Sequence, residues 1–262
     1  MGQSKDLNLK ETKQFAIDMA KDAAKIAMKT FGKVHEYRSK ESKEQLVSQV
    51  DIDSENLIKS RIFERFPDHA ILAEESGKNE KDSEYLWIID PIDGTRNYLH
   101  GHPTFGISIA LAKNKKVVLG VVYFPVYDWM FTAVKGNGAE LNGRKIKVSD
   151  RTTDNDTLGC YGCDFHRQKD EQMAVLSRYV DLIRKVRIEG AATFGFCLVA
   201  NGTYDAYIQR FLKPWDYAAS CLIIEEAGGK VTDYKGTPWT IEMENLIASN
   251  GRFHDKLLKV VR

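Results

Sequence analysis

The chain has 262 residues, with 38 Lys and Arg against 37 Asp and Glu, which leaves a formal charge of +1. Because 43% of its residues are hydrophobic, it can bury a core, and the composition excludes a disordered chain. A balanced charge also gives no bulk attraction for nucleic acid or an anionic membrane, whose binding depends on clustered Lys and Arg.

The N-terminal segment and the cysteines favour the cytoplasm. Residues 1–13 are mostly polar and charged, unlike a secretory signal, and the most apolar run, 117–124, is far shorter than the roughly 20 residues that span a bilayer. Four cysteines are too few for a disulfide framework. Cys160 and Cys163 have the spacing of a redox pair or half a zinc site, but no second ligand pair accompanies them, so we expect structural thiols.

In chain order, the first part of the sequence predicts helices followed by strands. Apolar residues at helical spacing predict a helix over 12–31, stopped by Gly32. An exposed charged loop is expected over 35–45, and a second helix should open near Asp51 and Asp53 as caps. Short apolar runs then predict strands, the last three forming an antiparallel meander: 70–73, 87–89, 104–112, 117–124 and 129–134.

The character of the sequence changes after residue 149. A polar stretch, 150–156, marks an expected domain boundary, and the alternation that follows is typical of an α/β unit. The segments expected in this part are a strand at 157–163, a helix at 169–184, an apolar segment at 194–200, a strand at 204–209 and a helix at 215–227.

Acidic residues cluster at the ends of the predicted elements. Asp90 and Asp93 follow an apolar strand, where Pro91 should bar the ladder from continuing and Gly94-Thr95 allows a tight turn. Glu74 follows another strand, and Asp216 and Asp51 open helices. Each acid alone suits an ordinary turn or helix cap. If they converge, they repel one another and require shared protons or a hard cation, and an all-oxygen donor set favours Mg²⁺, Mn²⁺ or Ca²⁺.

These motifs closely resemble those of the inositol monophosphatase family of metal-dependent, lithium-sensitive sugar phosphatases. The first family signature is matched by residues 87–98, and the second by 214–219 followed by 226–229. The resemblance implies a five-layer αβαβα sandwich, of mixed α+β and α/β class. An N-terminal half over residues 1–149 and a C-terminal half over residues 150–262 would meet at the active site.

The resemblance also implies a role for individual residues. Two Mg²⁺ ions would share Asp90, a weaker third ion near Glu74 would hold the attacking water, and Mn²⁺ would be an alternative cation. Thr95, bonded to Asp51, would help to activate that water. The implied metal ligands are Glu74, Asp90, the main-chain carbonyl of Ile92, Asp93 and Asp216. The implied substrate and phosphate contacts are Asp93, Gly94, Thr95, Gly190, Ala192, Gln209 and Asp216.

Two positions depart from the inositol-preferring members. Gln209 stands where those members have a Glu that binds sugar hydroxyls, and Arg96 is seen more often in histidinol-phosphate-type relatives. Both departures argue against strict specificity for inositol. The resemblance itself implies a phosphomonoesterase that uses a metal-activated water on a small polyol or sugar phosphate similar to inositol 1-phosphate. Histidinol phosphate, fructose 1,6-bisphosphate and nucleotide-type phosphates are the alternatives. The charged residues Lys40, Lys43 and Glu44 lie in the loop before Asp51. In relatives this region can fold over the metal site, and the alternative is a charged loop that is only solvated.

The expected partners are a small phosphorylated metabolite and a second copy of the chain, since the family commonly forms homodimers. We expect lithium inhibition and no binding to nucleic acid or membrane. A non-catalytic alternative is a regulatory binding protein of transcription complexes, a role that some family members have. A two-metal nuclease is disfavoured by the lack of a basic stripe.

Overall fold

The computed structural model describes residues 7–33, 37–39, 46–152 and 156–262. Its helices are α1 (Leu9–Thr30), α2 (Gln49–Arg65), α3 (Thr95–Leu99), α4 (Lys169–Leu182), α5 (Ala192–Ala200), α6 (Pro214–Glu226) and α7 (His254–Val260). Its strands are β1 (Tyr37–Ser39), β2 (Leu46–Ser48), β3 (Ala70–Ala73), β4 (Gly77–Lys78), β5 (Tyr85–Asp93), β6 (Gly106–Lys113), β7 (Lys116–Phe124), β8 (Trp129–Val134), β9 (Ala139–Leu141), β10 (Arg144–Lys145), β11 (Leu158–Tyr161), β12 (Lys185–Arg187), β13 (Ala206–Gln209), β14 (Lys230–Thr232) and β15 (Leu246–Ser249).

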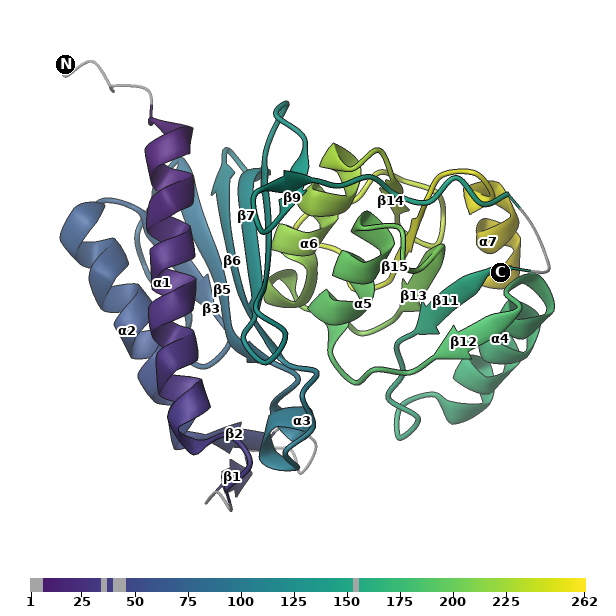
Figure 1. Cartoon of the computed structure of the whole chain (residues 1–262), viewed down its shortest axis with the longest axis horizontal. Coiled ribbons are helices and arrows are strands. Elements are labelled where there is room, and N and C mark those ends of the chain that lie inside the picture. Colours follow the sequence, from purple (N-terminus) through teal and green to yellow (C-terminus); the bar gives the residue numbers. More distant parts are fainter. Residues whose placement is uncertain (1–6, 34–36, 40–45, 153–155) are drawn as a thin grey trace.

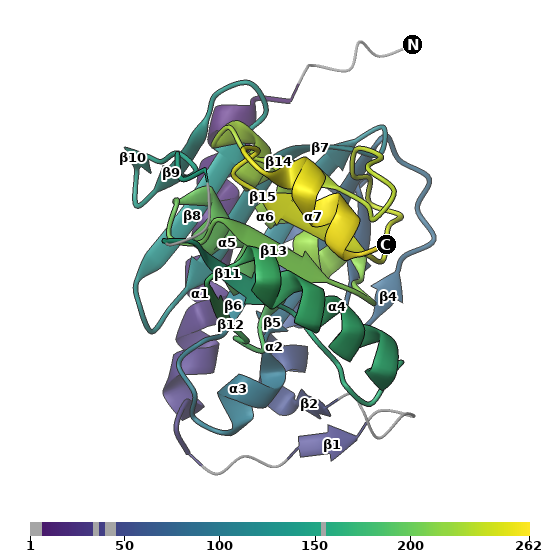
Figure 2. The ribbon, with the colours of Figure 1, turned by 90° about the vertical axis from the view of Figure 1, so that its right-hand side faces the viewer.

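The elements stack in five layers, which confirms the expected αβαβα sandwich (Figure 1). Helices α1 and α2 cover one face of an eight-stranded sheet, and α5 and α6 lie between that sheet and a five-stranded one. Helices α4 and α7 cover the outer face of the second sheet (Figure 2).

The first sheet has the order β10-β9-β8-β7-β6-β5-β3-β4. Strands β5 to β9 pair antiparallel in succession, so the predicted meander is confirmed, and β3 joins parallel to β5. Successive side chains of a strand point to opposite faces. Accordingly Ile107 and Ile109 of β6 pack with α1 and α2, whereas Ala110 and Ala112 join the cluster that includes α5 and α6.

Helix α6 lies directly on this sheet because β7 has a glycine at the contact. A Cβ on Gly120 would lie 2.5 Å from the carbonyl oxygen of Ala219 in α6, closer than non-bonded atoms approach. Glycine at this position therefore allows the short distance between α6 and the sheet. Helix α6 carries Asp216 in its first turn.

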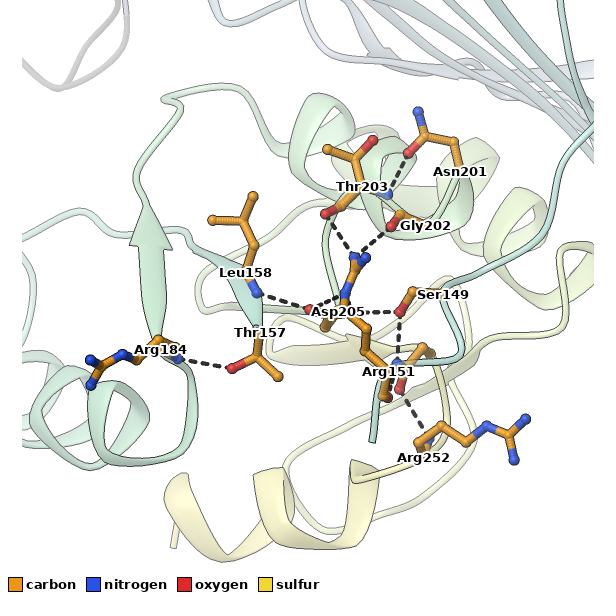
Figure 3. A network of polar contacts seen from close by, with 11 residues as sticks. Ser149, Arg151, Thr157, Leu158, Arg184, Asn201, Gly202, Thr203, Asp205 and Arg252 are labelled. Atoms are coloured by element: carbon orange, nitrogen blue, oxygen red, sulfur yellow. Dashed lines mark hydrogen bonds and ion pairs between the residues drawn. The ribbon is translucent and has the colours of Figure 1, made fainter. Parts of the chain in front are cut away.

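The second sheet has the order β12-β11-β13-β15-β14, with β11 parallel to β12 and β13. The segment that leads into it is anchored by a buried carboxylate (Figure 3). Asp205 is fully buried and accepts hydrogen bonds from the Ser149 hydroxyl, the Arg151 Nε at 2.8 Å and the Leu158 N–H at 2.8 Å. This network fixes the chain where it passes from one sheet to the other.

Some local expectations were wrong. Residues 37–39 were expected in an exposed loop but pair antiparallel with 46–48 as β1 and β2. Because α2 begins at Gln49, directly after β2, Asp51 lies inside the first turn and is not a cap. The candidate loop residues Lys40, Lys43 and Glu44 lie outside the described part of the chain.

Candidate active site

The end of β5 carries the first group of predicted site residues. Asp90 pairs with Ser108 of β6, and the next pair is Asp93 with Gly106, so β5 has one extra residue here. The prediction that Pro91 ends the ladder was wrong in part, because the strand continues to Asp93 through this bulge, which proline's missing N–H favours. The Ile92 N–H donates to Asp90 Oδ1 at 3.0 Å and fixes that carboxylate.

The chain turns from β5 into α3 at Gly94, as predicted. Gly94 has φ +88°, and a Cβ there would lie 3.0 Å from Thr104 O and from Ala191 Cβ, so glycine fits both the turn and the packing. Thr95 opens α3, and its hydroxyl lies 3.2 Å from Asp51 Oδ1 and 3.1 Å from Ile92 O. Asp51 is fully buried. The predicted pairing of Thr95 with Asp51 is therefore present.

Asp93 accepts hydrogen bonds from the start of α5, which lies between the two sheets. Its Oδ1 accepts from the Ala192 N–H at 3.0 Å, and its Oδ2 accepts from the Thr193 N–H at 2.7 Å and from the Thr193 hydroxyl. Asp93 thus binds the first two N–H groups of α5, where a helix favours negative charge. The Ala192 N–H is consequently already used, although Ala192 was expected to contact substrate.

Asp216 occupies the start of α6 as predicted. Its Oδ2 accepts from the Lys213 N–H at 2.7 Å, and Pro214 occupies the first turn. The helix is further fixed to the first sheet by Ser108, whose hydroxyl donates to the carbonyl of Trp215 at 3.2 Å. These contacts hold Asp216 relative to β5 and β6.

Burial and mutual repulsion act together on the acids. Burial raises the pKa of Asp90 well above its ordinary value, and the charges of its acidic neighbours raise it further. Those neighbours are Glu74, Asp93, Asp216 and Asp51. Burial raises the pKa of Asp93 to about 6, against the opposing effect of its hydrogen bonds from Thr193, and burial raises the pKa of Asp216 to about 7. The fold therefore gathers these acids within electrostatic reach of Asp90.

A small cavity of about 170 Å³ opens beside these acids. Its walls include five predicted residues: Asp93, Gly190, Ala192, Gln209 and Asp216. Asp51, Glu74, Asp90 and Thr95 lie outside that lining. The described residues of the cavity wall include two carboxylates and no Lys or Arg. A phosphate ester entering this cavity would meet negative charge, so its binding requires cations.

The donor chemistry fits a hard divalent cation, because every candidate ligand is an oxygen and Asp90 is a buried carboxyl among acidic neighbours. Within the residues that the structure describes, however, no three His, Cys, Asp or Glu side chains are arranged as a group that could hold a metal ion. Asp93 and Asp216 are bonded to N–H groups of α5 and α6. A carboxylate has about four lone-pair sites, so these bonds leave capacity for a further ligand.

Several residues at the site were not singled out from the sequence. Thr193 binds Asp93, and the Asn97 amide donates to Thr104 O and Glu189 O, both at 2.7 Å, which joins α3 to the segment before α5. The Tyr207 hydroxyl donates to Gln209 Oε1 in the cavity wall. Asn97 lies within the first matched signature, whereas nothing in the local sequence marks Thr193 or Tyr207.

The four cysteines are free, and their positions agree with structural thiols. Cys197 and Cys221 are buried, as is Cys160, and burial raises the pKa of Cys163 to about 11. Such thiols are poor nucleophiles. Cys163 nevertheless lines the cavity.

Comparison with known proteins agrees with this geometry. The inositol monophosphatase family matches residues 8–262. A fructose-1,6-bisphosphatase/inositol-1-monophosphatase from Aquifex aeolicus (strain VF5) is 36% identical over 263 residues, covering 97% of each chain. A putative Nus factor SuhB from Neisseria meningitidis serogroup B is 40% identical over 218 residues, covering 82% of this chain and 84% of its own.

The fold is also that of a solved structure. The Thermotoga maritima IMPase TM1415 superposes with a TM-score of 0.89 at 35% identity, covering 96% of each chain. Among the described residues, no helix is long and apolar enough to cross a membrane.

Proposed function

Since the chain belongs to the inositol monophosphatase family and is a phosphatase, we propose that it is a Mg²⁺-dependent phosphomonoesterase acting on a small polyol or sugar phosphate, such as inositol 1-phosphate. The observation that carries the proposal is the set of acids around Asp90, beside a cavity whose described wall has no basic residue. Phosphoryl transfer is largely a problem of positioning and charge, and such a site needs cations to accept a phosphate.

The residues that would hold Mg²⁺ are Glu74, Asp90, the carbonyl of Ile92, Asp93 and Asp216. We place two or three ions there, with Mn²⁺ as a substitute. When bound, Mg²⁺ supplies positive charge to the phosphoryl oxygens and lowers the pKa of a bound water. The two halves, residues 1–149 and 150–262, would each contribute ligands. The hydrogen bonds that Asp93 accepts from Ala192 and Thr193 join the two halves at the site and support this.

Thr95 and Asp51 would prepare the nucleophile. The Thr95 hydroxyl can donate its proton to the Asp51 carboxylate or the Ile92 carbonyl, which leaves the lone pairs of the oxygen to accept a hydrogen bond from water. As that water attacks, its proton would pass to the Thr95 oxygen while the Thr95 hydroxyl proton moves to the carboxylate of Asp51. The N–H groups of Gly94 and Thr95 would donate to the phosphate, while Gly190, Ala192 and Gln209 would contact the remainder of the substrate.

Fructose 1,6-bisphosphate is the second candidate substrate. Gln209 is neutral, and its Oε1 accepts from Tyr207, so its amide N–H groups are the part that can donate to an anionic or hydroxyl oxygen. A second phosphate would not be repelled there. The name of the Aquifex aeolicus relative, which includes fructose-1,6-bisphosphatase, supports this alternative.

We further propose a lithium-sensitive homodimer in the cytoplasm that binds neither nucleic acid nor membrane. The four free cysteines support a reducing compartment. Size-exclusion chromatography with light scattering tests the dimer, and phosphate release in the presence of Li⁺ tests the inhibition.

The central experiment measures phosphate release from inositol 1-phosphate, fructose 1,6-bisphosphate, histidinol phosphate and a nucleoside monophosphate, with Mg²⁺ or with EDTA. Activity should require Mg²⁺ and should be abolished by Asp90→Asn, a variant whose circular dichroism should match the wild type. Asp53→Asn, which removes an exposed acid of α2, is the matched control and should remain active. Full activity of Asp90→Asn, or activity in EDTA, contradicts the proposal.

A further inference from the structure

Helix α2 has a buried polar face that extends beyond Asp51. Glu55 lies one helical turn after Asp51 and is 2% exposed, and Lys59 lies one turn further with a side chain 22% exposed. Residues four apart lie on the same side of a helix. The neighbouring buried residues Ile58 and Ile62 are apolar. A carboxylate buried beside them costs free energy unless it is bonded, so its partners indicate its role.

Both carboxylate oxygens of Glu55 have partners. Oε2 accepts from the N–H of Glu75 at 2.8 Å, and Oε1 lies 3.4 Å from the Lys59 ammonium. Lys59 also donates to the Ser76 hydroxyl at 2.9 Å. Helix α2 therefore holds two consecutive residues of the segment that follows β3, one by its main chain and one by its side chain.

Glu74 immediately precedes these two residues. Its own N–H donates to the carbonyl of Ile89 in β5 at 3.2 Å, one residue before Asp90. Glu74 is thus attached to β5 on one side and, through Glu75, to α2 on the other. The separation of Glu74 from Asp90 depends on both attachments, and the main-chain attachment to α2 passes through Glu55.

We propose that Glu55 is a positioning residue for the metal-binding acids, and that it acts by holding the N–H of Glu75 and so fixing Glu74 relative to Asp90. The inference rests on the proposed function, which assigns Glu74 and Asp90 to Mg²⁺. Glu55 ligates neither metal nor substrate in this role. Helix α2 would then support the site at two points. Asp51 bonds to Thr95, and Glu55 fixes Glu74 through the N–H of Glu75.

Three substitutions separate this role from simple stabilisation of α2. Glu55→Asp keeps the charge but is one methylene too short to hold Glu75, whereas Glu55→Gln keeps the reach and an acceptor oxygen. Ile62→Ala, on the same helix but in the apolar core, is the control that destabilises α2 and leaves the bonds from Glu55 and Lys59 to residues 75 and 76 in place. The measurements are the dissociation constant for Mn²⁺ by isothermal titration calorimetry and the melting temperature of each full-length protein.

Glu55→Asp should weaken Mn²⁺ binding about tenfold, the usual effect of losing an outer contact to a metal site. Glu55→Gln should bind within about twofold of the wild type, as the conservative variant, and Ile62→Ala should melt lower with unchanged affinity. Wild-type affinity in Glu55→Asp, or equal loss in Ile62→Ala, overturns the inference. A wild-type protein that binds no Mn²⁺ instead contradicts the proposed function itself. If Glu55→Asp does not fold, Glu55→Ala, which removes the carboxylate that accepts from the Glu75 N–H, takes its place, and unchanged Mn²⁺ affinity in that protein overturns the inference.

Discussion

The carboxylate of Asp93 accepts two hydrogen bonds from Thr193, which lies 100 residues away in the chain. One comes from the main-chain N–H and the other from the hydroxyl, so only the second depends on the side chain. Thr193→Val should lower Mg²⁺-dependent phosphate release roughly tenfold, because Asp93 loses a charge-assisted bond that orients it. The measurement is the rate as a function of Mg²⁺ concentration.

Thr193→Ser retains the hydroxyl and is the matched control for that variant. It should keep most of the wild-type rate. Equal loss in the Ser and Val variants would show that the methyl packing of Thr193, and not its hydroxyl, is what matters.

Gln209 should influence the choice of substrate. A Glu side chain at this position would still accept the hydrogen bond from Tyr207. Its second oxygen would accept from sugar hydroxyls, and its negative charge would repel a second phosphate. Gln209→Glu should therefore raise the ratio of kcat/KM for inositol 1-phosphate over fructose 1,6-bisphosphate on the order of tenfold, the effect of one hydrogen bond to a charged group. Steady-state kinetics with both esters checks this, and an unchanged ratio contradicts it.

The stability of the metal-free protein should depend on pH through Asp216. Its pKa is raised to about 7 in the folded protein from an ordinary 3.8. Between about pH 4 and 7 the folded state holds a proton that the unfolded chain has lost, so the contribution of Asp216 to the free energy of unfolding falls as pH rises. Across that range the contribution falls by about 1.4 kcal/mol for each unit of pH.

Asp216→Asn removes this contribution, together with the charge by which Asp216 raises the pKa of Asp90. His254 acts in the opposite direction in the same range, since its buried ring has a pKa lowered to about 4, but it is present in both proteins. In EDTA, the melting temperature of Asp216→Asn minus that of the wild type should increase from pH 4.5 to pH 8. Added Mg²⁺ at pH 8 should stabilise the wild type more than the variant. A difference in melting temperature that stays constant with pH contradicts the prediction.

Gly120→Ala should destabilise the protein. The new methyl group would lie 2.5 Å from a main-chain oxygen of α6, which cannot rotate away as a side chain can. The expected loss is roughly 1–3 kcal/mol, as for other overpacked cores, with lower activity because α6 carries Asp216. Thermal melts and phosphate release measure the two effects, and a variant that matches the wild type in both would show that α6 shifts freely on the sheet.

The sequence was most informative where an element is long or ends in an acid. Strands β6 to β8 have six to nine residues and clear apolar runs. Asp93 ends β5, and Asp216 lies in the first turn of α6. The strands β12 and β15 were missed because three or four residues carry little pattern, and their state depends on pairing with β11 and β13.

The residues that support the site could not be predicted from local sequence patterns for a similar reason. Thr193, Tyr207 and Glu55 have ordinary neighbours in the sequence, and their roles arise from contacts with Asp93, Gln209 and Glu75 that only the folded chain creates. Asp51 was expected as a cap because Asp suits that position, but β2 runs straight into α2 and places Asp51 inside the first turn of the helix.

The first turns of helices α5 and α6 include residues that line the cavity. Both helices then run between the two sheets (Figure 1). The apolar side chains that set the thickness of this central layer therefore also set the gap between Asp93 and Asp216. A substitution in that layer should therefore change turnover as well as folding, even at positions that no substrate ever reaches.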